Sequence, residues 1–170
     1  ERTEDRLNAY AEDMARKVRL SYPTQVIARM IETDLADSFV LGAAKDVTAK
    51  LLKSAARQGF RLGQTPVTAF LKVHSGVHSG MTEKELAAAR QQLQKLHRVY
   101  QLTPSNEAMP VLMKLVMTSA YDVVAYPKAA FTERYIAEYQ TMHGKVPPQA
   151  EPQLIYSRAE QVSSVTYNLF

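Results

Sequence analysis

Residues 82–101 read TEKELAAARQQLQKLHRVYQ, and this stretch decides the fold. Thr82 followed by Glu85 is the signature of a capping box, in which two side chains satisfy the free backbone N–H groups at a helix start. Apolar side chains then recur at the three- and four-residue spacing of one helix face: Leu86, Leu93, Leu96, Val99 and Tyr100. The stretch therefore predicts one long amphipathic helix.

The rest of the chain has the same periodicity. Apolar stripes predict helices over about 3–19, from Thr24 onward, over about 46–58, after Pro66, over about 106–116, after Ser119, after Pro127 and from about Glu151. Prolines and glycines separate these segments: Pro23, Gly42, Gly59, Pro104, Pro127 and Gly144. No alternating strand pattern competes. The sequence predicts an all-α protein, a multi-helix orthogonal bundle of about seven to nine helices.

Three finer expectations concern the first half. Thr24, just after Pro23, is expected to cap the second helix through its side chain. The apolar stripe of that helix is expected to extend to Leu35, and Asp46 is expected to cap the third helix.

A loop is expected where a His-Ser-Gly triplet occurs twice, at residues 74–80. This loop predicts a division into two small helical subdomains, residues 1–75 and 82–170, joined by residues 76–81. The last helix has apolar positions up to Val165 and Tyr167. It is expected to continue into downstream sequence of a longer polypeptide.

Composition describes an ordinary folded domain. The chain has 170 residues, of which 46% are hydrophobic and 22% charged, and this length suits one domain or two small ones. No apolar run approaches the roughly 20 residues of a membrane span. The absence of cysteine excludes disulfides, thiol catalysis and cysteine-ligated metals. The net charge of +4 is too diluted to indicate a polyanion partner.

The histidines are weak candidates for chemistry. His74 and His78 have the spacing of two ligands on one helix face, but Gly76 and Gly80 disfavour a helix there. A polar loop is the preferred interpretation and a metal site the alternative. His97 is expected to be a half-buried structural residue. His143 is expected to interact with the dipole at a helix C-terminus.

Other patterns are also typical of structure rather than catalysis. Acidic pairs lie beside basic residues, as on a solvated helix face: Glu4/Asp5, Glu12/Asp13, Glu32/Asp34 and Glu83/Glu85. Tyrosines and methionines at four-residue spacing are expected in the core: Tyr135, Tyr139, Met109, Met113 and Met117. The sequence contains no phosphate loop, nucleophile elbow or dinucleotide fingerprint. We therefore assign no catalytic, cofactor-binding or metal residue and expect no enzyme.

One segment suggests an alternative function. Residues 112–124 contain two short apolar stretches joined by a tight turn, as in a helix-hairpin-helix module whose backbone amides contact DNA phosphates. Such turns usually contain glycine, whereas this one reads Val-Met-Thr-Ser. The basic residues Lys114, Lys128 and Arg134 are scattered. A nucleic-acid-binding module is the second hypothesis.

A family resemblance begins at Leu93. It is carried by six motifs: Leu93-Gln-Lys-Leu-His-Arg-Val-Tyr-Gln-Leu-Thr-Pro104, Glu107-Ala-Met109, Thr118-Ser-Ala-Tyr-Asp-Val-Val124, Ala129-Ala-Phe131, Tyr156-Ser-Arg-Ala-Glu-Gln-Val162 and Asn168-Leu-Phe170. This run resembles the N-terminal α-helical region of the A subunits of bacterial toxin-complex (Tc) insecticidal toxins and related neuraminidase-like large proteins.

The resemblance implies a non-catalytic part of a large, pore-forming virulence protein that carries a separate toxic enzyme across a membrane. It implies a secreted or cell-surface location. Its partners would be other domains of the same polypeptide and neighbouring subunits of a homo-oligomer. The resemblance implies no cofactor, no small-molecule substrate and no catalytic residue.

Overall fold

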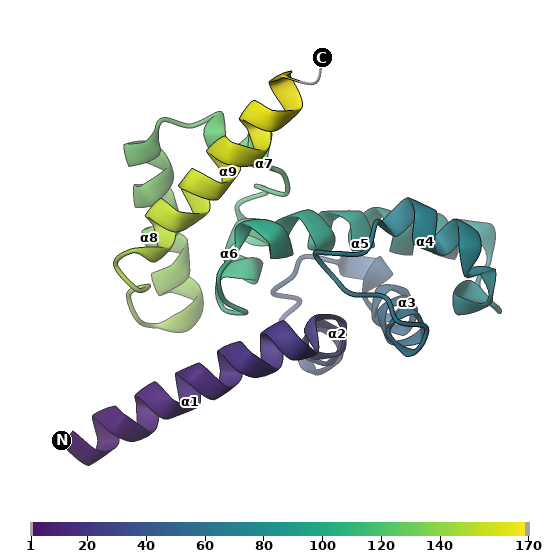
Figure 1. Cartoon of the computed structure of the whole chain (residues 1–170), viewed down its shortest axis with the longest axis horizontal. Coiled ribbons are helices and arrows are strands. Elements are labelled where there is room, and N and C mark those ends of the chain that lie inside the picture. The colour runs from purple at the N-terminus through teal and green to yellow at the C-terminus, as the bar shows by residue number, and fades with distance from the viewer. Residues whose placement is uncertain (1, 169–170) are drawn as a thin grey trace.

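Between residues 2 and 168, which are the residues described by the computed structural model, the chain forms helices and no strand (Figure 1). The elements are α1 (Arg2–Ser21), α2 (Pro23–Thr33), the 3-10 helix η1 (Gly42–Ala44), α3 (Lys45–Arg57), α4 (Val67–Val73), the 3-10 helix η2 (Ser75–His78), α5 (Glu83–Leu102), α6 (Ala108–Lys114), α7 (Ala120–Val124), α8 (Lys128–His143) and α9 (Glu151–Asn168). These nine α-helices confirm the predicted all-α bundle within the described range. Tyr167, an expected apolar position of the last helix, lies outside the part whose side chains are described, as do residues 168–170 of the last motif.

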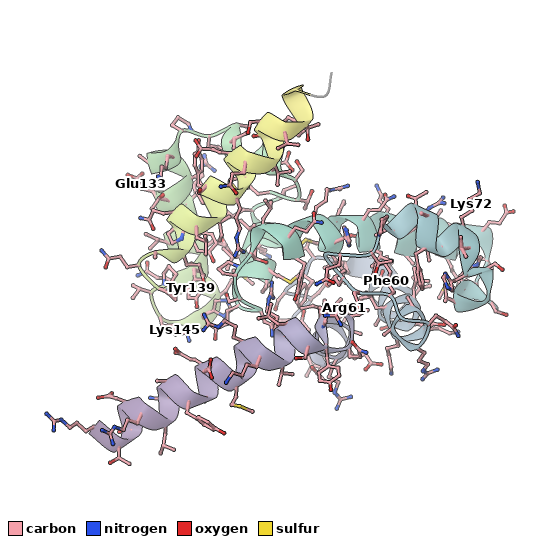
Figure 2. All side chains as sticks on the ribbon, viewed as in Figure 1. Phe60, Arg61, Lys72, Glu133, Tyr139 and Lys145 are labelled. Carbon is pink, nitrogen blue, oxygen red and sulfur yellow. The ribbon has the colours of Figure 1, made fainter. Side chains whose placement is uncertain are left out.

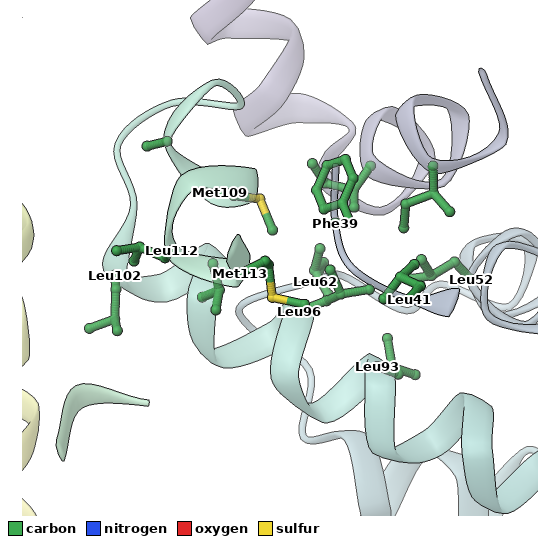
Figure 3. Packing of buried hydrophobic residues seen from close by; sticks show 14 of the residues in the cluster. Phe39, Leu41, Leu52, Leu62, Leu93, Leu96, Leu102, Met109, Leu112 and Met113 are labelled. Carbon is green, nitrogen blue, oxygen red and sulfur yellow. The ribbon is translucent and has the colours of Figure 1, made fainter. Parts of the chain in front are cut away.

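Helix α5 forms the centre of the fold, and one of its faces is buried from Ala89 to the C-terminal end of the helix. That face consists of Ala89, Leu93, Leu96, Val99 and Leu102. Buried side chains from both halves of the chain pack around it, as Figure 3 shows for Phe39, Leu41, Leu52, Leu62, Met109, Leu112 and Met113. Each fully buried large apolar side chain stabilises the fold by roughly 1.5–3 kcal/mol.

The hydrophobic cluster continues across the expected boundary at 76–81. Val77, in η2 within that segment, is itself a buried member of the cluster. The segment thus contains one turn of 3-10 helix where a loop was expected, because backbone hydrogen bonds continue from the end of α4. The division into subdomains 1–75 and 82–170 stays a prediction.

The predicted start of α5 is confirmed. The backbone N–H of Glu85 donates to Thr82 Oγ1 (3.2 Å), and the N–H of Thr82 donates to Glu85 Oε2 (2.8 Å). The hydrogen bond from the Thr82 backbone lowers the pKa of the Glu85 carboxyl. The predicted end of α8 is confirmed as well, since Gly144 has a φ of +67° and its N–H bonds back to the carbonyl of Gln140.

The expected cap of α2 is wrong. Tyr22 occupies the N-cap position, and Thr24 lies inside the helix because Pro23 starts it. Thr24 is fully buried, where its hydroxyl donates to the carbonyl of Phe60 (2.8 Å) and accepts from the N–H of Leu62 (2.9 Å). The Thr24 hydroxyl therefore links the start of α2 to the loop after α3 by two hydrogen bonds.

Two other expectations for the first half are also wrong. Leu35 lies beyond the end of α2 and is 97% exposed, because the carboxylate of Asp34 accepts from the N–H groups of Ala36 and Ser38 and turns the chain. Asp46 lies in the first turn of α3, whose N-cap is Ala44 without a side-chain hydrogen bond. Helix α6 is also shorter than expected, since Val116 has a φ of +57° and ends the helical backbone.

The two terminal helices extend from the rest of the fold in different directions (Figure 1). Arg19 is the one buried residue in α1, Arg2–Ser21. In α9, no residue from Glu160 to Thr166 is buried. Both helices therefore present long stretches of side chains to the surroundings.

Candidate functional site

Arg19 anchors α1 to the junction between α5 and α6. Its side chain is only 4% exposed, and its guanidinium donates to Asn106 Oδ1 (2.6 Å) and to the carbonyl of Thr103 (2.9 Å). The guanidinium lies over the ring of Tyr100, 4.1 Å from the centroid. Burial lowers the pKa of Arg19 to about 10, so the side chain remains cationic at neutral pH.

A second arginine holds the same end of α1. Arg61, in the loop after α3, donates from its guanidinium to the carbonyls of Leu20 (2.9 Å) and Ser21 (3.3 Å). These carbonyls belong to the last turn of the helix, where backbone acceptors lack partners within the helix. Together the two arginines fix the C-terminal end of α1, and the rest of the helix extends beyond them.

The polar face of α1 lines a cleft of about 720 Å³. The helix contributes Ala9, Glu12, Asp13 and Arg16 to one wall, and the segments 104–107 and 145–148 contribute to the other. Figure 2 shows Tyr139 and Lys145 on the side of the molecule that faces α1. The charged face of this amphipathic helix is therefore directed toward its own domain.

Two carboxylates in this cleft are engaged by tyrosines of α8. Glu151 is buried and accepts from the Tyr135 hydroxyl (2.5 Å) and from Ser105 Oγ (3.1 Å). Glu107 accepts from the Tyr139 hydroxyl and from Lys145 Nζ (3.2 Å). The two pairs tie the loops before α6 and α9 to α8.

Both tyrosines are held in the protonated form. Burial and the hydrogen bond to Glu151 raise the pKa of Tyr135, and burial and the bond to Glu107 raise the pKa of Tyr139. Burial raises the pKa of Glu107, but the hydrogen bonds from Tyr139 and Lys145 outweigh it and leave the pKa below its usual value. At neutral pH the phenols are protonated donors and Glu107 is an anionic acceptor. The arrangement supplies structural hydrogen bonds and no phenolate nucleophile.

The opposite face of α1 is apolar and exposed. We call this face the α1 stripe; it consists of Leu7, Tyr10, Ala11, Met14 and Val18, which lie within an arc of about 100° on the helix. The exposed fractions are 63% for Leu7, 64% for Tyr10, 41% for Met14 and 43% for Val18. An amphipathic surface helix normally packs its apolar face on the core. Here that face points outward, and contiguous exposed apolar patches mark interaction sites.

The histidines are placed as structural residues. His74 stacks on Phe70 with ring centroids 4.2 Å apart, and His97 Nδ1, half-buried, accepts from the N–H of Gly63 (3.0 Å). Burial lowers the pKa of His97. His143 is the last residue of α8, and its Nε2 lies 2.9 Å from the carbonyl oxygen of Glu107. Within the described residues, no three or more His, Asp or Glu side chains converge as metal ligands, so His74 and His78 have no further ligand at hand.

Backbone N–H groups of the turn between α6 and α7 donate hydrogen bonds to acceptors of the same two helices. The N–H of Met117 donates to the carbonyl of Leu112 (2.9 Å), and the N–H of Thr118 donates to Asp122 Oδ2 (3.0 Å). Ser119 caps α7 by accepting from the N–H of Asp122 (3.3 Å). A carboxylate thus occupies a position that a DNA phosphate would need, which disfavours a helix-hairpin-helix contact at this turn.

The methionine and tyrosine stripes are buried as expected: Met109, Met113, Met117, Tyr135 and Tyr139. Acidic residues of the pairs form exposed ion pairs, Asp13 with Lys17 (2.7 Å) and Glu32 with Lys53 (2.7 Å). Sequence reasoning missed Arg19, Glu107 and Glu151. The two glutamates could have been sought as partners of the tyrosines that the sequence predicts to be buried, because a buried tyrosine hydroxyl needs a hydrogen-bond acceptor.

Two further findings bear on the class of protein. In the stretch from Arg2 to Asn168, no helix combines the length and the apolar content that a membrane crossing requires. No protein-family profile, no curated protein and no solved structure was found to match the chain.

Proposed function

We propose that this chain is a non-catalytic structural and interaction domain of a large toxin-complex A-like protein, a pore-forming carrier that translocates a separate toxic enzyme. The proposal rests on the resemblance of residues 93–170 to that family and on the α1 stripe. Its partners would be other domains of the same polypeptide and neighbouring subunits of a homo-oligomer. The parent protein would be secreted or associated with the cell surface.

The observation that carries the interaction role is the orientation of α1. The helix directs Glu12 and Arg16 toward its own domain and exposes Leu7 and Met14 on the opposite face. Removing apolar surface from water contributes about 25 cal/mol per Å², so covering the α1 stripe would be favourable. A helix oriented in this way supports a role in contact with another protein surface.

The size of the native polypeptide tests the family part of the proposal. We expect an antibody raised against this chain to detect, in the source cells, a band several times larger than 19.1 kDa. The native extract should also elute from a sizing column as an assembly larger than one polypeptide. A band near 19.1 kDa would contradict the toxin-complex assignment.

A matched pair of substitutions in the native polypeptide tests the interaction part. Met14→Glu places a charge in the α1 stripe, and Leu35→Glu places the same charge at an exposed leucine outside α1. We expect Met14→Glu to change the elution volume of the native assembly and Leu35→Glu to leave it unchanged. Identical elution for both variants would show that the α1 stripe is not a contact surface.

A further inference from the structure

We propose that the α1 stripe pairs, in antiparallel orientation, with the α1 stripe of a second copy of this chain. The inference rests on the proposed interaction function and specifies its partner. It is carried by the position of α1 in the fold, by the order of large and small residues along the stripe, and by the distribution of charge.

The fold leaves space for a second helix. The domain lies on the polar side of α1, where Glu12 and Arg16 line the cleft, and the α1 stripe lies on the opposite side. Helix α1 also extends away from the other helices toward its N-terminus (Figure 1). When two stripes face each other, the two domains are therefore on the outer sides of the helix pair and do not collide.

Two copies of the α1 stripe fit each other when the two helices run in opposite directions. In an antiparallel pair centred between residues 12 and 13, Leu7 faces Val18 and Ala11 faces Met14 of the second copy. The Met14 side chain thus faces the small Ala11 side chain, and the contacts repeat on both sides of the centre. A parallel pair would instead place Met14 against Met14 and Ala11 against Ala11, which leaves gaps beside Ala11.

The charges favour the same orientation. Lys17 lies two helical turns after Tyr10, on the same border of the α1 stripe. In the antiparallel pair this border meets the same border of the second copy, so Lys17 approaches the ring of Tyr10, a favourable cation–π arrangement. A parallel pair would instead bring this border to the opposite border of the second copy, away from its Tyr10. Antiparallel helix dipoles are also mutually attractive.

A lipid surface fits α1 less well than a second copy does. Helices that bind membrane surfaces carry many Lys and Arg residues on their polar face. Residues 2–21 contain five basic and four acidic side chains, and the polar face includes Glu12 and Asp13. A surface of nearly balanced charge is better suited to another protein helix.

Sedimentation of the 170-residue chain tests the pairing. Over about 5–500 μM we expect a reversible monomer–dimer equilibrium, because a contact made by one helix pair is at the small end of specific interfaces. Met14→Glu should weaken dimerisation by at least about tenfold. Arg16→Glu alters charge on the opposite face and should dimerise like the parent chain. Circular dichroism should show unchanged helix content in both variants.

Cysteine cross-linking tests the orientation, since the chain has no cysteine of its own. Under mild oxidation, a mixture of Leu7→Cys and Val18→Cys chains should form a mixed disulfide dimer. Each variant alone should stay uncross-linked, because residues 7 and 18 are about 16 Å apart along the helix. Cross-linking of Leu7→Cys with itself would overturn the antiparallel arrangement.

A chain that stays monomeric over the whole concentration range would overturn the self-pairing. The proposed function would not fail with it, since it predicts a large native polypeptide, which the immunoblot tests independently. A dimer that Met14→Glu leaves intact would also overturn the inference, because such a dimer would use another surface.

Discussion

The guanidinium of Arg19 lies 4.1 Å from the ring centroid of Tyr100, whose hydroxyl donates a hydrogen bond back to the Arg19 backbone carbonyl (3.1 Å). The contact is thus reciprocal, and it joins the last turn of α1 to the end of α5. Because Arg19 is the one buried residue of α1, Arg2–Ser21, the position of the whole helix depends on this contact and on Arg61. The α1 stripe is presented outward only while the contact holds.

Arg19→Ala is expected to loosen α1. The substitution removes hydrogen bonds to Asn106 and Thr103 and the stacking on Tyr100, with an expected loss of about 1–3 kcal/mol in the free energy of unfolding. Amides of residues 2–21 should exchange faster with solvent, while those of α5 keep most of their protection. Arg19→Lys should behave similarly, because an ammonium cannot reproduce the planar guanidinium. Hydrogen exchange by mass spectrometry measures both effects.

Arg16→Ala is the matched control, since Arg16 is one helical turn earlier and its side chain is 70% exposed. It should leave both stability and exchange nearly unchanged, as exposed ion pairs contribute little. Equal exchange rates in α1 for the Arg19 and Arg16 variants would show that Arg19 does not anchor the helix.

Gly63→Ala is expected to destabilise the same region through a clash with Tyr100. Gly63 has a φ of +83°, and a Cβ there would lie 2.5 Å from Tyr100 Cδ1. Gly59→Ala separates the two causes, because Gly59 has a φ of +86° with no atom within 4 Å of the added Cβ. Backbone strain alone should cost about 1 kcal/mol at Gly59, and the clash should add at least as much at Gly63. Urea unfolding of both variants measures the difference, and equal losses would contradict the close contact.

Acid is expected to weaken the fold partly through Glu107. Its folded-state pKa is below the usual value, so the carboxylate contributes stability that is present above about pH 4.5 and is lost as the pH falls through the folded pKa. Glu107→Gln should therefore lower stability at pH 6 and make the decline between pH 6 and pH 3 shallower. Part of the decline should remain, because the pKa values of Glu85, Glu32 and Asp13 are also lowered. Urea midpoints across this pH range measure the effect.

Glu133→Gln is the control for the acid experiment. Glu133 is exposed on α8 (Figure 2), and the substitution removes the same charge without touching the Tyr139 contact. It should keep the slope of the parent chain. A parent-like slope in Glu107→Gln would show that the carboxylate is not stabilised in the folded state.

Core substitutions in α5 and in α8 should both be costly. Leu96 and Phe131 are fully buried, so Leu96→Ala and Phe131→Ala should each reduce the free energy of unfolding by about 2–5 kcal/mol. Leu35→Ala, at a 97% exposed position, should change it by less than about 0.5 kcal/mol. Thermal unfolding compares the three variants. An unchanged melting temperature in Leu96→Ala would contradict the placement of α5 at the centre.

The sequence predicted helices better than it predicted what they contact. Local signals determine α5, since a capping box and an apolar stripe need only neighbouring residues. The direction of the α1 stripe could not be predicted, because periodicity identifies an apolar face and not the surface that covers it. Thr24 was misassigned for a similar reason, since its partners Phe60 and Leu62 are distant in sequence. The Tyr135–Glu151 contact likewise depends on how α8 and α9 meet.

Binding to nucleic acid is expected to be absent, and this distinguishes the two functions considered for the chain. A phosphate approaching the turn at 115–119 would meet the Asp122 carboxylate, which already accepts from the N–H of Thr118 and the hydroxyl of Ser119 (2.9 Å). Electrostatic binding is strongest at low salt, so fluorescence anisotropy with labelled single-stranded and duplex DNA at about 20 mM salt is the most sensitive test. We expect no change in anisotropy. Binding that weakens steeply with added salt would favour the nucleic-acid-binding module over the interaction domain, and loss of that binding in Lys114→Glu would locate it at this turn.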